Sequence, residues 1–301
     1  MPRKKIIVSI CGGLGNQMFQ YAAGRALALQ FGVPLQLDVE WFESFGEDTT
    51  PRKFQLLHFP FLMPHVTTTA SESWRVRLAK GIKSRLLHFS CAAHKIFPSI
   101  VFESNFSYWP DNRALTTSVF LYGYWQSEKY FASNASQIRK DFTFSSLPEG
   151  EAQVVATRIH ACRDAVSVHI RRGDYISNPQ AHAFHGLPRL DYYRAALEHI
   201  RTVMGNTTVF LFSDDPQWVR ENFDPCGHAC EVVELNLPDA PQHDMHLMSL
   251  CRHHVIANSS FSWWGAWLGQ QDGIVVAPSK WFAKKNFNEY KEIYCLKWII
   301  L

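Results

Sequence analysis

The chain has 301 residues, of which 47% are apolar, and its 30 basic and 27 acidic residues leave a net charge of +3. This length suits two domains, and the apolar content supports large cores and excludes a disordered chain. A charge this close to balance argues against a protein that binds nucleic acid. Seven scattered cysteines, an odd number, are typical of a reducing compartment.

No apolar run reaches the ~18 residues that a transmembrane helix needs, and the apolar run at 6–11 is too short for a signal peptide. We therefore expect a cytoplasmic protein. The segment 73–95 is basic and contains no acidic residue. Two interpretations of it stay open: a solvated helix face, and a peripheral contact with an anionic membrane surface.

The N-terminal residues follow a strand, helix, strand order. A short apolar strand is expected at 5–10, a helix over 18–31 with Gly32 as its stop, and a second strand at 34–38. This order is typical of the βαβ units of α/β proteins.

The turn before that helix carries Gly13, Asn16 and Gln17. The glycine spacing, with Asp38 about twenty residues downstream, partly matches a dinucleotide-binding fingerprint, but Met18 stands at the third glycine. What remains is a tight turn at a helix N-terminus, which suits an anion or a sugar.

The stretch 165–175 reads AVSVHIRRGDY and alternates like a strand before it reaches a polar turn. His169 and Arg171 share one face, and Arg172 points to the other. Ligands of parallel α/β sheets bind beyond the carboxyl ends of strands, where an Arg offers a planar fork of donors to a phosphate. A structural pair between an Arg and Asp174 on a surface loop is the alternative.

A second apolar strand at 209–212 ends in Asp214, Asp215 and Pro216. Pro216 fits the first position of the next helix, so Asp215 is its natural N-cap. This leaves Asp214 free to project from the strand end, where its carboxylate can accept two N–H bonds from a guanine edge.

A third strand at 255–257 precedes Ser259 and Ser260, and a helix over 262–268 is expected to stop at Gly269. The unpaired N–H groups of a helix N-terminus and two small hydroxyls form a cradle for phosphate. Ordinary helix capping is the alternative.

The three strand ends together predict a site for a nucleotide diphosphate. The first carries Arg and His, the second Asp, and the third two serines. The base would lie at Asp214 and the phosphates at Arg171 and Ser259. The cysteines and histidines lack zinc-site spacing, and no Asp-x-Asp motif occurs, so no metal is expected. A turn-rich stretch near residue 150 divides the chain into domains 1–150 and 151–301.

Six motifs distributed along the chain form a recognisable series. They are GGLGNQMFQYAAGRALA (Gly12–Ala28), RKFQLLHF (Arg52–Phe59), YWQSEKYF (Tyr124–Phe131), HIRRGDY (His169–Tyr175), FSDDPQWV (Phe212–Val219) and NSSFSWWGAWL (Asn258–Leu268). In this order they resemble the bacterial α-1,2-fucosyltransferases of glycosyltransferase family 11. Protein O-fucosyltransferases and α-1,6-fucosyltransferases are more remotely similar.

The resemblance implies an α/β fold of GT-B type, with two Rossmann-like domains that face a cleft. The N-terminal domain would lie on the acceptor side, and the C-terminal domain would bind GDP-fucose. The resemblance implies that His169 and Asp214 contact guanine and that Arg171 binds the β-phosphate. The implied donor-binding set comprises Gly13, Gln17, His169, Arg172, Asp214, Ser259, Ser260 and Phe261, and the implied catalytic set comprises Arg171, Asp174 and Asn16.

The implied reaction is inverting and needs neither metal nor other cofactor. The 2-hydroxyl of a terminal β-galactose attacks C1 of GDP-β-L-fucose, and Arg171 stabilises the charge that builds on the departing GDP. No motif presents an obvious general base for the hydroxyl. Asp174 is the first choice, ahead of Asp38, Glu40 and His185.

Three alternatives stay open. One is a fucosyltransferase of another linkage or a transferase of another nucleotide sugar. A second is an NAD-dependent oxidoreductase built on Gly13, Gly15 and Asp38, and a third is a catalytically silent GDP-sugar-binding module. The sequence does not reveal the acceptor, which could be a galactose-terminated oligosaccharide or a glycolipid, nor the oligomeric state. A glycolipid would agree with peripheral binding at the inner membrane through 73–95.

Overall fold

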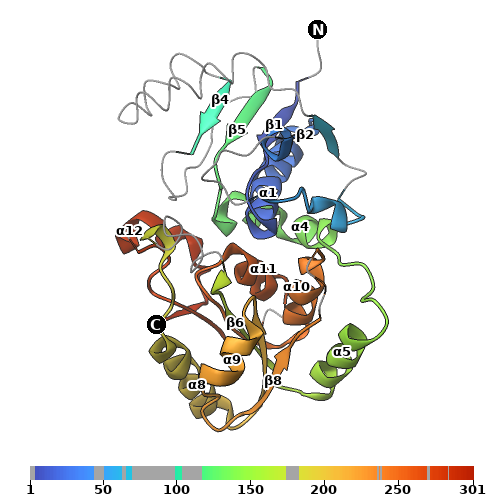
Figure 1. Cartoon of the computed structure of the whole chain (residues 1–301). Helices are drawn as coiled ribbons and strands as arrows, with labels where there is room; N and C mark the ends of the chain where they lie inside the picture. Colours follow the sequence, from blue (N-terminus) through green and yellow to red (C-terminus); the bar gives the residue numbers. More distant parts are fainter. Residues whose placement is uncertain are drawn as a thin grey trace. The chain divides into compact units, whose positions relative to one another are not determined.

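The computed structural model divides the chain into two compact units (Figure 1). The N-terminal unit comprises Met1–Ser145 with Lys291–Ile293, and the C-terminal unit comprises Ser146–Tyr290 with Tyr294–Leu301. The return of a short C-terminal segment to the first unit is not evident from the sequence. The structure describes residues 4–43, 51–62, 66–69, 99–103, 117–173, 183–235, 237, 239–269, 272–283 and 285–301. The basic segment 73–95 and Asp174 lie outside these ranges.

The N-terminal unit is built on a five-stranded parallel sheet with the order β3-β2-β1-β5-β4. Its strands are β1 (Ile6–Ser9), β2 (Leu35–Asp38), β3 (Val66–Thr69), β4 (Ile100–Phe102) and β5 (Val119–Tyr122). Its α-helices within the described ranges are α1 (Leu14–Phe31) and α4 (Ala135–Asp141). Short 3-10 helices occupy Glu40–Glu43, Leu56–His58, Glu128–Tyr130 and Ala132–Asn134, and the returning segment forms another at Lys291–Ile293.

Helix α1 begins at Leu14, earlier than the sequence predicts, because the carbonyl of Gly13 already accepts N–H groups of the first turn. The helix ends as predicted at Gly32, which adopts the left-handed conformation with φ 60°. Gly24 lets α1 approach the sheet closely, since a Cβ there would lie 2.2 Å from Cγ2 of Val8.

The C-terminal unit is built on a six-stranded parallel sheet with the order β11-β10-β9-β6-β7-β8. Its strands are β6 (Val166–Ile170), β7 (Thr208–Ser213), β8 (Ala229–Val233), β9 (His253–Val255), β10 (Val275–Ala277) and β11 (Ile299–Ile300). Its described α-helices are α5 (Glu151–Ala161), α8 (Leu190–Met204), α9 (Pro216–Asn222), α10 (Pro241–Leu250), α11 (Ser260–Leu268) and α12 (Phe287–Tyr290). The third predicted strand therefore lies slightly earlier than expected, and α11 starts at Ser260 rather than at 262.

Helices cover both faces of this second sheet, as the apolar runs of its strands require. Val209 and Leu211 of β7 belong to a core shared with α8 and α9. Phe210 and Phe212 alternate with them and belong to a separate core shared with α5 and α10. The two cores fix the strands in register and leave the strand ends as the places for polar chemistry.

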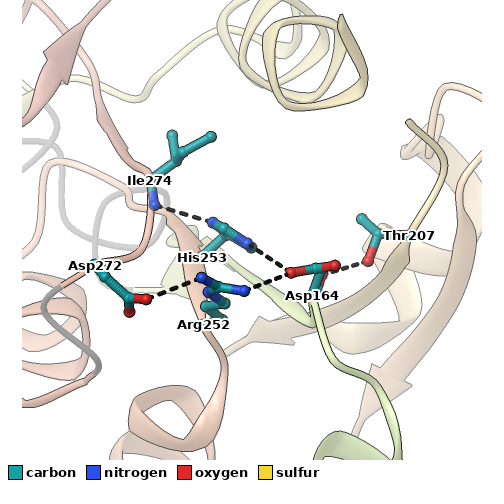
Figure 2. A network of polar contacts seen from close by, with 6 residues as sticks. All are labelled: Asp164, Thr207, Arg252, His253, Asp272 and Ile274. Atoms are coloured by element: carbon teal, nitrogen blue, oxygen red, sulfur yellow. Dashed lines mark hydrogen bonds and ion pairs between the residues drawn. The ribbon is translucent and has the colours of Figure 1, made fainter. Parts of the chain in front are cut away.

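A network of polar contacts lies at the amino-terminal ends of the strands of the second sheet (Figure 2). Asp164 accepts a hydrogen bond from Nη1 of Arg252 at 3.0 Å, and Nη2 of Arg252 donates to Asp272 at 2.9 Å. The backbone N–H of Ile274 donates to Nδ1 of His253 at 3.0 Å. These groups precede or begin β6, β9 and β10, so the network has the structural role of joining the starts of these three strands.

Each sheet has one place where the strand order reverses, between β1 and β5 and between β6 and β9. Ligands of open parallel sheets bind at such a reversal, outside the carboxyl ends of the strands. None of the described helices combines the length and apolar character needed to cross a bilayer. The six cysteines within the described ranges form no disulfide.

Candidate active site

The ends of β6 and β7 are joined by an ion pair. Nη1 of Arg171, which follows β6, lies 2.8 Å from Oδ2 of Asp214, which follows β7. Oδ1 of Asp214 accepts the backbone N–H of Arg172 at 2.8 Å. The expectation that Asp214 projects freely from the strand end is therefore wrong, because the neighbouring strand presents partners to both of its oxygens. Its carboxylate holds the turn that carries Arg171.

The charge of Asp214 is stabilised by this turn. Burial disfavours the charged carboxylate, but the Arg171 guanidinium and the backbone N–H groups of Arg172 and Gly173 outweigh burial and hold the pKa of Asp214 below its ordinary value. Gly173 leaves no room for a side chain, since a Cβ there would lie 2.5 Å from Oδ2 of Asp214. The turn thus requires glycine at position 173.

His169 lies inside the same strand end and is 4% exposed. Its ring faces Phe261 of α11, with 5.6 Å between the ring centroids. Burial lowers the pKa of His169 to about 4, with the Arg171 charge acting in the same direction and the Asp214 carboxylate in the opposite one. Nδ1 has no hydrogen-bond partner among the described residues. A neutral, buried imidazole with an unpartnered nitrogen is suited to a polar edge of a ligand.

His185 enters the site from the loop before α8. Burial and the positive charge of Arg171 lower the pKa of His185 to about 4. Nδ2 of Asn258 donates to the carbonyls of His185 at 3.0 Å, Gly186 at 3.2 Å and Trp281 at 3.2 Å. Asn258 therefore fixes the loop that brings His185 into the field of Arg171.

Arg172 points away from Arg171 and takes other partners. Its Nε lies 3.2 Å from Oδ2 of Asp215, and its Cζ lies 3.6 Å from the ring centroid of Trp218. Asp215 caps α9 as predicted, since Oδ1 accepts the backbone N–H of Trp218 at 3.2 Å. Arg172 is thus held against the first turn of α9, and a donor-binding role for it stays a prediction.

Ser259, Ser260 and Phe261 follow β9, the strand next to β6 at the order reversal. Oγ of Ser259 accepts the backbone N–H of Phe261 at 3.3 Å and caps α11. The capping interpretation of Ser259 is confirmed. The three predicted strand ends do lie on adjacent strands, in the order β9, β6, β7.

The predicted residues Gly13 and Gln17 belong to the N-terminal unit. Gln17 is fully buried, and its Nε2 donates to the carbonyls of Gly12 at 2.8 Å and Lys53 at 2.9 Å. Its Oε1 accepts the backbone N–H of Gln55 at 2.8 Å. Both ends of the amide are therefore engaged by the protein. Gln17 clamps the glycine turn to the segment around Gln55 rather than presenting its amide to a donor, which corrects the expected role.

Asn16 accepts a hydrogen bond from Nε2 of Gln126 at 2.8 Å. Among the predicted general bases, Asp38 ends β2 at 2% exposure, and its Oδ1 accepts the backbone N–H of Glu40 at 3.2 Å. Asp174 lies outside the described residues, so its role stays a prediction.

Sequence reasoning missed Gln126, Asn258 and Trp218 as organising residues. Each lies within one of the long motifs, and each follows a strand within a few residues. Position after a strand is the signal that could have singled them out.

Acid is expected to destabilise this protein through its buried histidines. His169 and His254 have pKa values of about 4 and about 3, both lowered chiefly by burial, whereas an unfolded histidine titrates near 6.5. Below about pH 6.5 the unfolded chain binds protons that the native state does not, so stability falls as the pH drops toward 4. At pH 5 each such histidine lowers the free energy of unfolding by about 2 kcal/mol relative to neutral pH.

The urea midpoint measured at pH 7.5 and pH 5.0 checks this expectation. The midpoint should fall while the m-value stays constant, because the surface exposed on unfolding does not change. An equal midpoint at both pH values would contradict the expected protonation.

Within the described residues, no group of three or more His, Cys, Asp and Glu side chains is placed to hold a metal ion. The site consists instead of a fixed guanidinium, a supporting carboxylate, neutral imidazoles and a helix N-terminus. These groups follow adjacent strands of a Rossmann-like unit, and the chain contains a second such unit. Two Rossmann-like units in one chain are the architecture of the GT-B class.

Comparison with known proteins gives the family. Residues 102–301 match the model of glycosyl transferase family 11. An alpha-1,2-colitosyltransferase of Escherichia coli is 32% identical over 95% of this chain and 95% of its own length. The O-antigen biosynthesis glycosyltransferase WbnK of Escherichia coli is 34% identical over 92% of this chain and 95% of its own length. The chain therefore belongs to glycosyltransferase family 11.

More distant proteins agree with this assignment. Galactoside alpha-(1,2)-fucosyltransferase 2 of Oryctolagus cuniculus is 25% identical over 92% of this chain and 71% of its own length. The crystal structure of the fucosyltransferase NodZ from Bradyrhizobium superposes with a TM-score of 0.53 at 12% identity, covering 88% of this chain and 92% of NodZ. This structural likeness supports the GT-B fold.

Proposed function

We propose that this enzyme transfers L-fucose from GDP-β-L-fucose to the 2-hydroxyl of a terminal β-galactose, with inversion and without a metal or other cofactor. The observation that carries the proposal is the Arg171–Asp214 pair at the end of β6, beside the buried neutral His169. A guanidinium held in place by the protein is a preorganised partner for a diphosphate. Family membership supports glycosyl transfer as the reaction.

The chemistry is a single displacement at C1 of fucose. The acceptor oxygen forms the new C1–O bond as the bond from C1 to the β-phosphate oxygen breaks, and the bonding pair leaves with GDP. Arg171 stabilises the charge that develops on the phosphate, an interaction stronger in the transition state than in the ground state. The proton of the acceptor hydroxyl passes to a general base, for which Asp174 stays our proposal.

The names of the relatives support this donor and one close variant. Colitose is L-fucose without its 3-hydroxyl, so the two sugars present the same anomeric carbon and differ at one hydroxyl. A site that hydrogen-bonds a substrate hydroxyl rejects an analogue lacking it by large factors. Rates with GDP-fucose and GDP-colitose therefore decide which sugar the site is built for.

Binding of GDP is expected to raise the melting temperature, whereas UDP, ADP and NAD leave it unchanged. A ligand at 100 times its dissociation constant stabilises a protein by about 2.7 kcal/mol, which a thermal-shift assay resolves easily. The shift should be the same with and without EDTA. A shift with NAD and none with GDP would contradict the donor assignment and favour the dinucleotide alternative.

Turnover tests the remaining elements of the proposal. The full chain is incubated with GDP-fucose or GDP-colitose and with lactose, N-acetyllactosamine or lacto-N-biose, and both GDP release and the product linkage by NMR are followed. An α-1,2-linked fucosyl galactoside is the expected product. GDP binding without turnover would support a silent binding module instead. A natural acceptor on a glycolipid, with membrane contact through 73–95, stays a prediction.

A further inference from the structure

The turn after β5 has an unusual backbone that two neighbours hold in place. Trp125 adopts the left-handed conformation with φ 56°, which is costly for a residue with a bulky side chain. The carboxylate of Glu103, at the end of the adjacent strand β4, accepts the backbone N–H groups of Tyr124 at 2.6 Å and Trp125 at 3.1 Å. These two bonds fix the backbone in its strained form.

Two further contacts leave this turn little freedom. A Cβ at Gly123 would lie 2.4 Å from Cβ of Glu103, so only glycine fits beside the carboxylate. Nε2 of Gln20, on α1, donates to the carbonyl of Gly123 at 3.1 Å. Strain of this kind persists only where the surroundings enforce it, and it is concentrated at functional sites.

The result of this backbone is the position of Gln126. This side chain is 7% exposed, and its Nε2 donates to Oδ1 of Asn16 at 2.8 Å. Gln126 follows β5 and Asn16 follows β1, and these two strands flank the reversal of strand order in the N-terminal sheet. The bond therefore spans the place in this unit where parallel sheets bind ligands.

The direction of the bond decides what Asn16 can do. The oxygen and the NH₂ of a side-chain amide point to opposite sides, so with its oxygen turned to Gln126 the NH₂ of Asn16, which only donates, is directed away from Gln126. That NH₂ lies above Gly12, where a Cβ would come within 2.8 Å of Nδ2. Gly12 has φ +76° and thus suits the turn as well as leaving room for the amide.

We propose that Gln126 is a positioning residue that orients the side-chain amide of Asn16 as a hydrogen-bond donor to substrate oxygen. Asn16 then supports the reaction by donation and does not act as its general base. This inference rests on the proposed function, since it concerns the same transfer reaction. It gives a residue of the YWQSEKYF motif a role in the reaction without requiring that Gln126 touch the substrate.

The first test is Gln126→Leu, which keeps the size of the side chain and removes the donor. We expect kcat for fucosyl transfer to fall about tenfold, the loss that follows removal of one hydrogen bond, while KM for GDP-fucose changes less than about twofold. The matched control is Gln137→Leu in the same unit, where the lost amide contacts Asp141 at 2.8 Å. An unchanged kcat in Gln126→Leu, or an equal loss in the control, would overturn the proposal.

A double-mutant cycle separates positioning from packing. If Gln126 acts through Asn16, then Gln126→Leu should cost nothing more in an Asn16→Ala background, whereas additive losses would refute the coupling. Gln126→Glu is a second variant of similar size, whose carboxylate accepts and would turn the Asn16 amide around. Its kcat should lie below that of Gln126→Leu, and wild-type activity in this variant would overturn the proposal.

The wild-type turnover panel is measured first, so that failure of the proposed function is recognised independently of the Gln126 variants. The circular dichroism spectrum and the melting temperature without ligand serve as the folding control for every variant, because Asn16, Gln126 and Gln137 lie in the N-terminal unit, and the GDP thermal shift reports separately on the C-terminal unit. A variant that keeps the wild-type spectrum, melting temperature and GDP shift but loses kcat supports positioning.

Discussion

Replacement of Arg171 by alanine is expected to lower kcat at least about 100-fold while the protein stays folded. The guanidinium is the preorganised cation of the site, and loss of one such donor typically costs about 2.7–4 kcal/mol of transition-state stabilisation. The variant also leaves the partly buried Asp214 without its 2.8 Å partner, so a carboxylate remains where the diphosphate should bind. Both effects act in the same direction. Steady-state kinetics with GDP-fucose and a galactoside acceptor measure the loss.

Two comparison variants define what Arg171 contributes. Arg171→Lys keeps the charge but offers a point donor in place of a planar fork, so it should recover only part of the rate. Arg189→Ala removes an arginine of the same unit whose side chain is 86% exposed and pairs with Asp191, and it should leave kcat unchanged. An Arg171→Ala enzyme within about tenfold of wild type would remove Arg171 from the catalytic role.

Local sequence signals predicted the elements that depend on near neighbours in the chain. Pro216 and Asp215 marked the start of α9 because proline position and capping are decided within one helical turn. Gly32 ended α1 for the same kind of reason. An apolar run identified β7 because both faces of a parallel sheet are buried, and alternation of apolar and polar residues identified β6. The observed strand order places the three predicted strand ends on adjacent strands.

The sequence could not predict which side chains form ion pairs or hydrogen bonds with one another, because these partners lie far apart in the chain. Arg171 and Asp214 meet only because β6 and β7 are neighbours, and no local pattern distinguishes a projecting carboxylate from one engaged by an adjacent turn. The same holds for Asn16 and Gln126, which come together through the pairing of β1 with β5. Gln17 illustrates the opposite error, since a polar residue beside a glycine turn proved to be bonded at both ends of its amide.

Replacement of Asp214 by asparagine is expected to weaken the binding of GDP and of inosine diphosphate by the same factor. The neutral amide would lack the charge that holds Arg171, and a charge-assisted hydrogen bond contributes about 1.5–3 kcal/mol, or roughly 10- to 150-fold in affinity. Inosine diphosphate lacks the 2-amino group of guanine but carries the same phosphates. Calorimetric titration of both nucleotides with wild type and variant measures the two factors.

The comparison of the two nucleotides separates support of Arg171 from recognition of guanine. Both oxygens of Asp214 already have protein partners, which favours a uniform loss. A loss confined to GDP would instead assign the carboxylate to the 2-amino group. Gly173→Ala gives an independent control, because its Cβ would lie 2.5 Å from Oδ2 of Asp214 and displace the carboxylate without removing it. If Asp214 acts by holding Arg171, this variant should reproduce the uniform loss and lower kcat as well.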